Sequence, residues 1–423
     1  MRWRNQILAL LCLTIFFALG VLYFRHWVVQ KPFGIILFIG EGLTPDRLAA
    51  TRLYAGGADS RLTIETLPAI ALLRNESNDF AVPDEAAAAT TLATGVKVNN
   101  RSIGIDPDGN KLKTILDRAR DKGRTIGLVT NGRLMNPTAA AFFAHSKGRP
   151  DEIAQQFADE KKIEIALGGG GAEFLPEAKG GQRTDSRDLI LDLRRNGFEI
   201  VRSKAELENV PRWRRSRVLG LFSSGEMAFA NQIAAGSEQP SLADMTRRAI
   251  ELLQWNPGGY FLIVDANLMG AAARENKAEM TLTETLELDR AVGVARSYAG
   301  DDATILVAGN FGIGGLALNG SPFRKDKGIA LLGVNAAGAP AVTWATGPDG
   351  PRNASNLNPQ NFDAAGQNLV PNSAHVQEPA AVYSPSAENT VTDALVAGRG
   401  PGSEALRGVR DNTIVFQIIE GEL

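Results

Sequence analysis

Short uninterrupted apolar runs recur along the chain after residue 31. They are Gly34–Ile39, Thr125–Val129, Gly259–Val264 and Thr304–Ala308. Runs of five or six apolar residues are typical of strands that are covered on both faces. Amphipathic helical patterns lie between and around them, at Ile153–Phe157, Leu189–Leu193, Ser241–Leu253 and Met280–Tyr298. The alternation predicts an α/β fold, a three-layer sandwich around a mostly parallel sheet.

The first 31 residues have a different pattern. Ile7 to Phe24 is an apolar run of 18 residues, with Arg2 and Arg4 before it and Arg25 after it. At about 1.5 Å per residue, a helix of this length just crosses a hydrocarbon core. We expect residues 1–31 to form an uncleaved membrane anchor. The alternatives are a cleaved signal peptide, with a small-x-small site at residues 18–20, and a buried core helix.

Both the anchor and the signal peptide export the remaining residues, 32–423, which we treat as one domain. The expected location is therefore periplasmic or extracellular, either membrane-anchored or, after cleavage, secreted. Residues 32–423 contain 41 Lys and Arg (45 − 4) against 47 Asp and Glu, a formal charge of −6. This balance argues against a nucleic-acid partner.

Two glycine-rich regions interrupt the pattern. Residues 320–371 are rich in Gly, Pro, Asn and Ala, with one β-like alternation near Ile329–Trp344, and predict an irregular insertion or a small edge sheet. The four glycines Gly168–Gly171 lack the Lys-Ser/Thr that follows a phosphate-binding loop, which favours a tight turn over a phosphate site.

Polar residues stand at three predicted strand ends. Glu41 follows the first apolar run, Asp265 the third and Asn310 the fourth. Ligands in open α/β sheets bind outside the carboxyl ends of the strands. For any single acid, the simpler explanation is that a strand end reaches the protein surface, where a charged side chain is solvated by water.

Several ordered segments resemble the alkaline phosphatase family from about residue 33 to residue 423. They are Phe38–Gly42, Pro83–Lys97, Arg101–Asp106, Pro137–His145 with Arg149, and Asp411–Phe416. The resemblance implies an alkaline-phosphatase-like fold and hydrolysis of phosphomonoesters through a phosphoserine intermediate. It also implies two zinc ions, one magnesium ion, a phosphate-binding arginine and a homodimer.

The resemblance also shows what this chain lacks. Glu85 stands at the position of the nucleophilic serine, and Arg149 at that of the phosphate-binding arginine. At the zinc positions Gly270 replaces an aspartate and Arg274 a histidine, and the second zinc motif falls on Asn310 and its neighbours. His375 alone stands where a zinc histidine would be, and the chain has only three histidines.

One remaining imidazole cannot hold two zinc ions, so a zinc pair is not expected. We predict an exported protein that has lost two-zinc hydrolysis and serves in binding or scaffolding. The alternative is an active phosphoric monoester hydrolase that uses at most one divalent metal and a nucleophile other than serine.

Two hypotheses describe what remains at the site. In the first, Glu85 takes the place of the phosphate and pairs with Arg149, Arg274 or both; the alternative is that the arginines extend to solvent. In the second, Glu41, Thr138 and Asp265 form a residual magnesium site. Its alternative is that Arg274 or a backbone amide compensates the acids.

Overall fold

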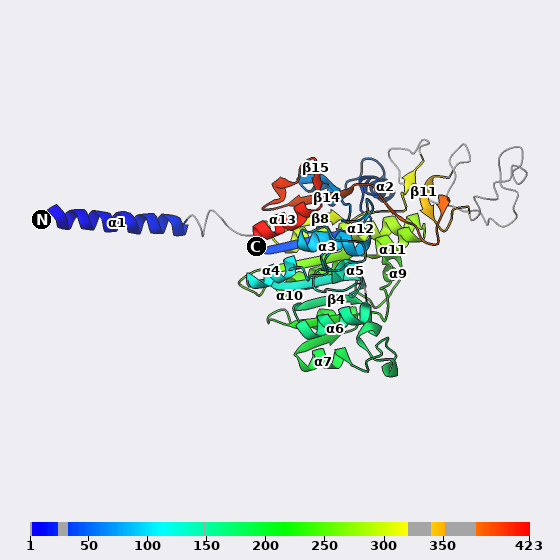
Figure 1. Ribbon diagram of the computed structural model, residues 1–423, viewed down its shortest axis with the longest axis horizontal. Coiled ribbons are helices and arrows are strands. Elements are labelled where there is room, and N and C mark those ends of the chain that lie inside the picture. The colour runs from blue at the N-terminus through cyan, green and yellow to red at the C-terminus, as the bar shows by residue number, and fades with distance from the viewer. Residues whose placement is uncertain (1, 24–32, 148, 320–339, 352–377) are drawn as a thin grey trace, which may run out of the picture.

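The computed structural model describes residues 2–23, 33–147, 149–319, 340–351 and 378–423 (Figure 1). Its centre is a ten-stranded sheet with the order β15-β2-β14-β8-β1-β7-β3-β4-β6-β5. The strands of this sheet are β1 (Gly34–Gly40), β2 (Ala69–Arg74), β3 (Thr125–Arg133), β4 (Ile165–Gly169), β5 (Phe198–Val201), β6 (Arg217–Leu221), β7 (Tyr260–Ala266), β8 (Thr304–Gly309), β14 (Ala394–Arg399) and β15 (Val409–Asp411).

The sheet is mostly parallel, as the apolar runs predict. β1 lies at its centre between β7 and β8, and both neighbours run parallel to it. β14 is the exception, because it is antiparallel to both β8 and β2. The four predicted runs correspond to β1, β3, β7 and β8. The main difference is β3, which continues to Arg133 through an irregular register after Val129.

Helices cover both faces of the sheet. They are α2 (Pro45–Gly56), α3 (Glu85–Thr94), α4 (Ile115–Asp121), α5 (Pro137–Ala140), α6 (Pro150–Glu160), α7 (Leu189–Arg195), α8 (Lys204–Asn209), α9 (Ala230–Ala234), α10 (Leu242–Leu253), α11 (Leu268–Arg274), α12 (Ala278–Tyr298) and α13 (Thr413–Glu422). All four predicted helices are present as α6, α7, α10 and α12. Ser241 caps α10 through the predicted capping box with Asp244.

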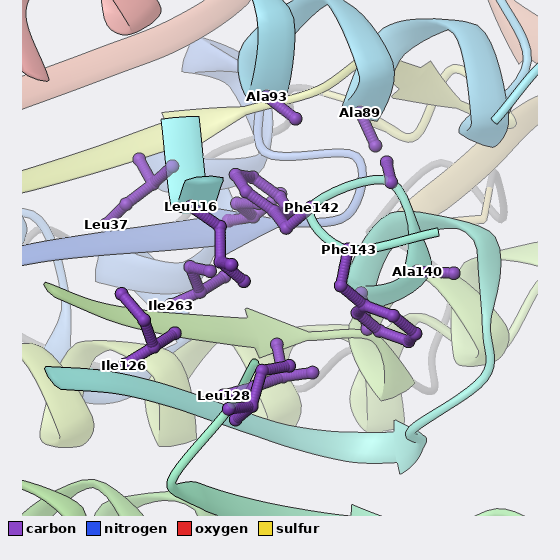
Figure 2. Packing of buried hydrophobic residues seen from close by; sticks show 14 of the residues in the cluster. Leu37, Ala89, Ala93, Leu116, Ile126, Leu128, Ala140, Phe142, Phe143 and Ile263 are labelled. Carbon is purple, nitrogen blue, oxygen red and sulfur yellow. The ribbon is translucent and has the colours of Figure 1, made fainter. Parts of the chain in front are cut away.

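Consecutive residues of the central strands face opposite sides of the sheet. Leu37 belongs to a cluster with α3, α4 and α5, whereas Phe38 belongs to a cluster with α10 and α12. Figure 2 shows the first cluster, in which Ala89 and Ala93 of α3 lie above Phe142, and the strand residues Ile126, Leu128 and Ile263 lie below it. Burial on both faces explains why the strands are apolar without alternation.

Small strands lie outside the main sheet. β10 (Ala317–Leu318), β11 (Val342–Gly347) and β12 (Ala380–Tyr383) form one sheet, and β9 (Gly312–Ile313) pairs with β13 (Asn389–Thr390). Most of the predicted insertion at 320–371 lies outside the described residues, and β11 covers the end of its predicted alternation. At the four glycines, β4 ends at Gly169 and Gly170 adopts a φ of +87°, which makes a turn as predicted.

The N-terminal apolar run forms helix α1 (Arg2–Tyr23). Within the described residues, its segment Trp3–Val21 is the one helix that is long and apolar enough to cross a membrane, and none of that segment is buried against the protein. A signal anchor and a signal peptide both fit this helix.

Candidate functional site

The polar residues predicted at the strand ends come together at one edge of the sheet. The strand register pairs Gly40 with Ala266 on one side and Gly309 on the other, so that Glu41 follows β1 beside Asn267 and Asn310. Asp265 lies opposite Ile39, two residues before Asn267. Asn310 Oδ1 accepts a hydrogen bond from the backbone N–H of Gly42 at 3.2 Å. Parallel strands thus bring residues from three distant segments together at this carboxyl edge, as expected for this class of sheet.

Glu41 is a buried carboxyl group with two side-chain donors. Its Oε1 accepts hydrogen bonds from Thr138 Oγ1 at 2.6 Å and from Asn267 Nδ2 at 2.8 Å. Burial raises the pKa of Glu41 well above its usual range, and the nearby carboxylates of Glu85 and Asp265 raise it further. The Thr138 hydroxyl and Arg274 offset only part of this pKa increase.

Asp265 is also fully buried, on β7. Its Oδ2 accepts a hydrogen bond from Thr130 Oγ1 at 2.9 Å, and its Oδ1 has no hydrogen-bond partner among the described residues. Burial raises the pKa of Asp265 to about 8, although the Thr130 hydroxyl opposes the shift and Glu85 adds to it. An unpaired buried oxygen is costly and leaves room for a donor or a cation.

The packing of Glu41 depends on the glycine at position 270 in α11. A Cβ atom on Gly270 would lie 2.6 Å from Glu41 Oε2 and 2.8 Å from Glu41 Cβ. The glutamate side chain therefore fills the space that any larger residue at position 270 would need. In this packing, the glutamate at position 41 and an aspartate at position 270 cannot both be accommodated unless one of them moves.

Glu85 is the first residue of α3. Asp84 caps this helix by accepting a hydrogen bond from the Ala87 N–H at 2.9 Å, and an acid in the first turn is favoured by the helix dipole. Glu85 Oε1 accepts a hydrogen bond from Arg274 Nη2 at 2.7 Å. About a quarter of each side chain is exposed, 26% for Glu85 and 29% for Arg274.

Arg274 is fixed by more than this ion pair. Its Nη2 also donates to Asn389 Oδ1 at 3.1 Å, and its Nη1 donates to the Ala387 carbonyl at 3.1 Å. Asn389 in turn donates to the Pro83 carbonyl at 2.8 Å, just before α3. The guanidinium therefore joins α11, the start of α3 and the segment at 387–389.

Arg149 does not take part in this cluster. It pairs with Glu152 in the first turn of α6, and 70% of its side chain is exposed. Of the two arginines that the sequence offered as partners for Glu85, the structure brings only Arg274 to it. His375 lies outside the described residues, and His145 Nε2 lies 2.9 Å from the Leu112 carbonyl oxygen.

Arg47 is a buried cation that the sequence analysis missed. It lies in the first turn of α2 with 2% of its surface exposed, and its Nη1 donates to the Glu41 carbonyl at 2.7 Å. Burial lowers its pKa to about 9, and Glu41 opposes this shift. A signal was present, because helical spacing places Arg47 beside Ala50 and Thr51, on the buried side of α2.

The described residues do not fit a pair of zinc ions. Among them, no group of three His, Cys, Asp or Glu side chains lies close enough to hold a metal. The positions that the resemblance assigns to zinc ligands hold Gly270, Arg274 and Asn310, of which the arginine is a fixed cation. A single magnesium ion is a different case. The carboxyl groups of Glu41 and of Asp265, whose Oδ1 is unpaired, and the Thr138 hydroxyl offer hard oxygen ligands.

Comparisons with known proteins give the family. The family model described as "Alkaline phosphatase" matches residues 34–423, which is most of the chain. The chain belongs to the alkaline phosphatase family. It is 29% identical over 434 residues to alkaline phosphatase 4 of Bacillus subtilis, covering 91% of this chain and 88% of that protein. It is 31% identical over 343 residues to the tissue-nonspecific alkaline phosphatase of Gallus gallus, covering 68% of this chain and 66% of that protein.

Solved structures agree on the fold. The alkaline phosphatase of Thermus thermophilus superposes with a TM-score of 0.72 at 23% identity, covering 93% of this chain and 91% of that chain. That of the Antarctic bacterium TAB5 superposes with a TM-score of 0.68 at 20% identity, covering 93% and 98%. A variant of the TAB5 enzyme is described with Mg bound in a site called M3. The predicted alkaline-phosphatase-like fold is confirmed.

A buried acid next to the site leads to a testable pH dependence. Glu284 of α12 accepts hydrogen bonds from Asn131 Nδ2 at 3.1 Å and from the Ala230 N–H at 2.5 Å, and burial raises its pKa from 4.5 to about 7. Its contribution to stability is therefore complete below about pH 4.5 and is lost as the pH rises through 7, by about 3 kcal/mol at most.

Glu284→Gln removes this titration. We expect the free energy of unfolding to fall less between pH 5 and pH 8 in the variant than in the native protein, as measured by urea unfolding in detergent. Glu238→Gln, at an exposed position, should leave the native slope unchanged. Equal slopes in the native protein and Glu284→Gln would refute the raised pKa.

Proposed function

We propose that this protein is a membrane-tethered member of the alkaline phosphatase family that does not hydrolyse phosphomonoesters by the two-zinc mechanism and acts through binding. The observation that carries the proposal is the ion pair between Glu85 and Arg274. It places an anion where the resemblance puts the attacking hydroxyl, and its partner is a cation where the resemblance puts a zinc ligand.

The charge of Glu85 opposes substrate binding at this position. A phosphate monoester brings negative charge to the nucleophile, and a carboxylate there repels it at a partly buried site. The Arg274 guanidinium pairs with Glu85 and also donates to Asn389 from its Nη2, so it is already engaged and is not free to bind a substrate phosphate. Glu85 thus acts as an internal substitute for the phosphate, held by the arginine.

In this proposal, two arginine side chains supply the positive charge that metal ions supply elsewhere in the family. Arg274 lies beside Glu85, and the buried Arg47 lies beneath Glu41. The two buried acids of the site, Glu41 and Asp265, have raised pKa values, so the interior of the site tolerates neutral carboxyl groups better than charged ones. We propose that such a site keeps the fold of the enzyme family but lacks the metal ions that would act on the phosphate ester.

Helix α1 supports attachment to a membrane. Its 19-residue segment Trp3–Val21 has a mean hydropathy of 1.7 and lies outside the folded core. We propose that it remains as an anchor and that the domain lies on the exported side. A secreted form after cleavage is the competing outcome.

A second candidate function keeps one metal. The unpaired Asp265 Oδ1, with Glu41 and Thr138 beside it, favours a single magnesium ion held by these three residues. When bound, the ion would supply positive charge for an ester oxygen. The chain's own contribution would be to orient the carboxyl groups through Thr130, Thr138 and Asn267.

Metal analysis combined with an assay tests the proposal. We expect purified full-length protein to contain far less than one zinc per chain, by inductively coupled plasma mass spectrometry. Turnover of p-nitrophenyl phosphate should equal that of heat-denatured protein, with or without added zinc. Glu85→Ser should gain no zinc-dependent turnover, because a hydroxyl alone does not restore the metal ligands.

The two candidates differ in their response to magnesium. A magnesium-dependent turnover that is lost in both Glu41→Gln and Asp265→Asn would support the second candidate. Zinc at two ions per chain, with turnover removed by a chelator, would overturn the loss of two-zinc hydrolysis.

A further inference from the structure

An arginine- and tryptophan-rich loop lies at the edge of the sheet opposite the candidate site. We call residues 211–217 (Pro-Arg-Trp-Arg-Arg-Ser-Arg), together with Trp255, the basic edge. The loop leads into β6 and Trp255 lies just before β7, so both lie at the amino ends of parallel strands. The candidate site lies at the carboxyl ends, across the full length of the strands.

The aromatic side chains of the basic edge are exposed. Trp213 is 75% exposed and Trp255 is 47% exposed, whereas Trp344, inside the domain, is buried. Two of the remaining tryptophans, Trp3 and Trp27, flank the apolar run of α1. Tryptophan side chains are enriched at the boundary between lipid and water. Exposure of two such large apolar side chains to water alone would be unfavourable.

Three of the four arginines of the basic edge, Arg212, Arg214 and Arg215, make only long contacts, whereas Arg217 donates to the Lys161 carbonyl at 2.7 Å. Arg212 pairs with the buried Glu251 at 3.4 Å, and the exposed Arg214 pairs with the partly exposed Glu199 at 3.4 Å; both contacts are long. Glu251 already has Arg247 and Arg248 as closer partners. Arg215 Nη2 donates to Asn256 Oδ1 at 3.2 Å. Exposed pairs of this kind contribute little and exchange readily for another anion.

Further cations lie beside the loop. Arg194 and Arg195 end α7, directly before β5, and no ion pair involves them within the described part of the chain. β5 pairs with β6, with Phe198 opposite Arg217. With these two, six arginines lie on or beside the loop: Arg212, Arg214, Arg215 and Arg217 in it, and Arg194 and Arg195 at the end of α7.

A cavity lies beneath the loop. Its volume is about 220 Å³, and its lining includes Arg215 and Arg217 with Leu252 and Leu253 of α10. Glu164 also lines it, although one oxygen of this acid accepts a hydrogen bond from the Ile126 N–H at 2.8 Å. A cavity lined by two leucines and two arginines suits an amphipathic anion, such as a phospholipid headgroup and the start of its acyl chains.

The connection to α1 enters the domain at this same edge. β1 begins at Gly34, opposite Tyr260 at the start of β7, and the Phe33 carbonyl accepts from the Tyr260 N–H at 3.0 Å. Ten residues separate α1 from Gly34, which limits the distance between them to about 38 Å. β6 lies four strands from β1, or about 19 Å.

We infer that the basic edge rests on the surface of the membrane that α1 spans and binds its anionic phospholipids. This inference rests on the proposed membrane attachment. The tryptophans insert at the level of the headgroups, and the arginines pair with lipid phosphates. The domain is thereby oriented with its candidate site facing away from the bilayer.

Hydrogen exchange in lipid nanodiscs tests the inference. Full-length protein is inserted into discs of phosphatidylcholine alone and into discs that also contain phosphatidylglycerol. We expect exchange in peptides that cover residues 212–217 and 254–258 to slow by about threefold or more in the anionic discs. The triple variant Arg212→Gln/Arg214→Gln/Arg215→Gln should lose this protection. Arg101→Gln/Lys277→Gln removes two exposed cations near the candidate site and should keep it.

The outcomes distinguish lipid binding by the basic edge from membrane attachment through α1. Insertion into both discs with equal exchange at the basic edge would overturn the inference and leave the anchor in place. Protection that persists in the triple variant would also overturn it. Failure to insert into either disc would overturn the membrane attachment on which the inference rests.

Discussion

Gly270→Asp should destabilise the protein by about 4 kcal/mol, because it adds both volume and charge to a filled space. The Cβ atom of the new residue would lie 2.6 Å from Glu41 Oε2. Its carboxylate would join Glu41 and Asp265, whose pKa values burial already raises. The measurement is the free energy of unfolding of the native and variant proteins by chemical denaturation at pH 7.

Two further variants separate volume from charge. Gly270→Ala brings only the steric conflict and should cost about 2 kcal/mol. Glu41→Asp in the Gly270→Ala background removes the conflict with Oε2 but keeps the contact with the Cβ atom of residue 41 at 2.8 Å, so it should recover part of that loss. If Gly270→Asp is as stable as the native protein, Glu41 moves aside freely and the pairing of residues 41 and 270 is refuted.

The fold was largely predictable from the sequence because its central strands are buried on both faces. Such strands leave continuous apolar runs that need no knowledge of the partner strands, and β1, β3, β7 and β8 were all found this way. β14 was not predicted. It is antiparallel between β8 and β2, and its segment Ala394–Arg399 mixes small, apolar and charged residues without a clear period.

The candidate site was predictable only in part. Strand ends located Glu41, Asp265 and Asn310, since parallel strands bring their carboxyl ends together. The hydrogen-bond donors Thr130 and Asn267 were not found, because nothing local marks a threonine or asparagine as the partner of a distant acid. Arg149 remained a candidate partner for Glu85 until the structure showed it at Glu152.

Residual magnesium binding remains a prediction. The hydrogen bonds to Glu41 and Asp265 favour it, because all of their donors are neutral side chains. Neither Arg274 nor a backbone amide donates to Glu41 or Asp265 among the described contacts; the donors are Thr138, Asn267 and Thr130. The sequence alternative, in which Arg274 compensates these acids directly, therefore gives way to a network of neutral donors. No cation is bonded to either carboxyl group among the described contacts, although Arg274 still lowers the pKa of Glu41 through space.

Arg274→Met should cost about 3 kcal/mol, whereas Glu85→Ala should cost about 1 kcal/mol or less. The asymmetry follows from the surroundings of the pair. Without Arg274, Glu85 stands uncompensated beside Glu41 and Asp265, and its carboxylate raises the pKa of both. Without Glu85, that repulsion is relieved, and Arg274 keeps Asn389 and the Ala387 carbonyl as acceptors.

The double variant Glu85→Ala/Arg274→Met decides whether the two charges act as a pair. Its free energy of unfolding should exceed that of Arg274→Met alone, with a coupling energy of about 1–2 kcal/mol. Arg149→Met, at an exposed arginine paired with Glu152, should change stability by less than about 0.5 kcal/mol and show no coupling to Glu85→Ala. If the stability losses of Glu85→Ala and Arg274→Met simply add in the double variant, Arg274 stabilises the site through the Ala387 carbonyl and Asn389. Glu85 would then not be held as a substitute for phosphate.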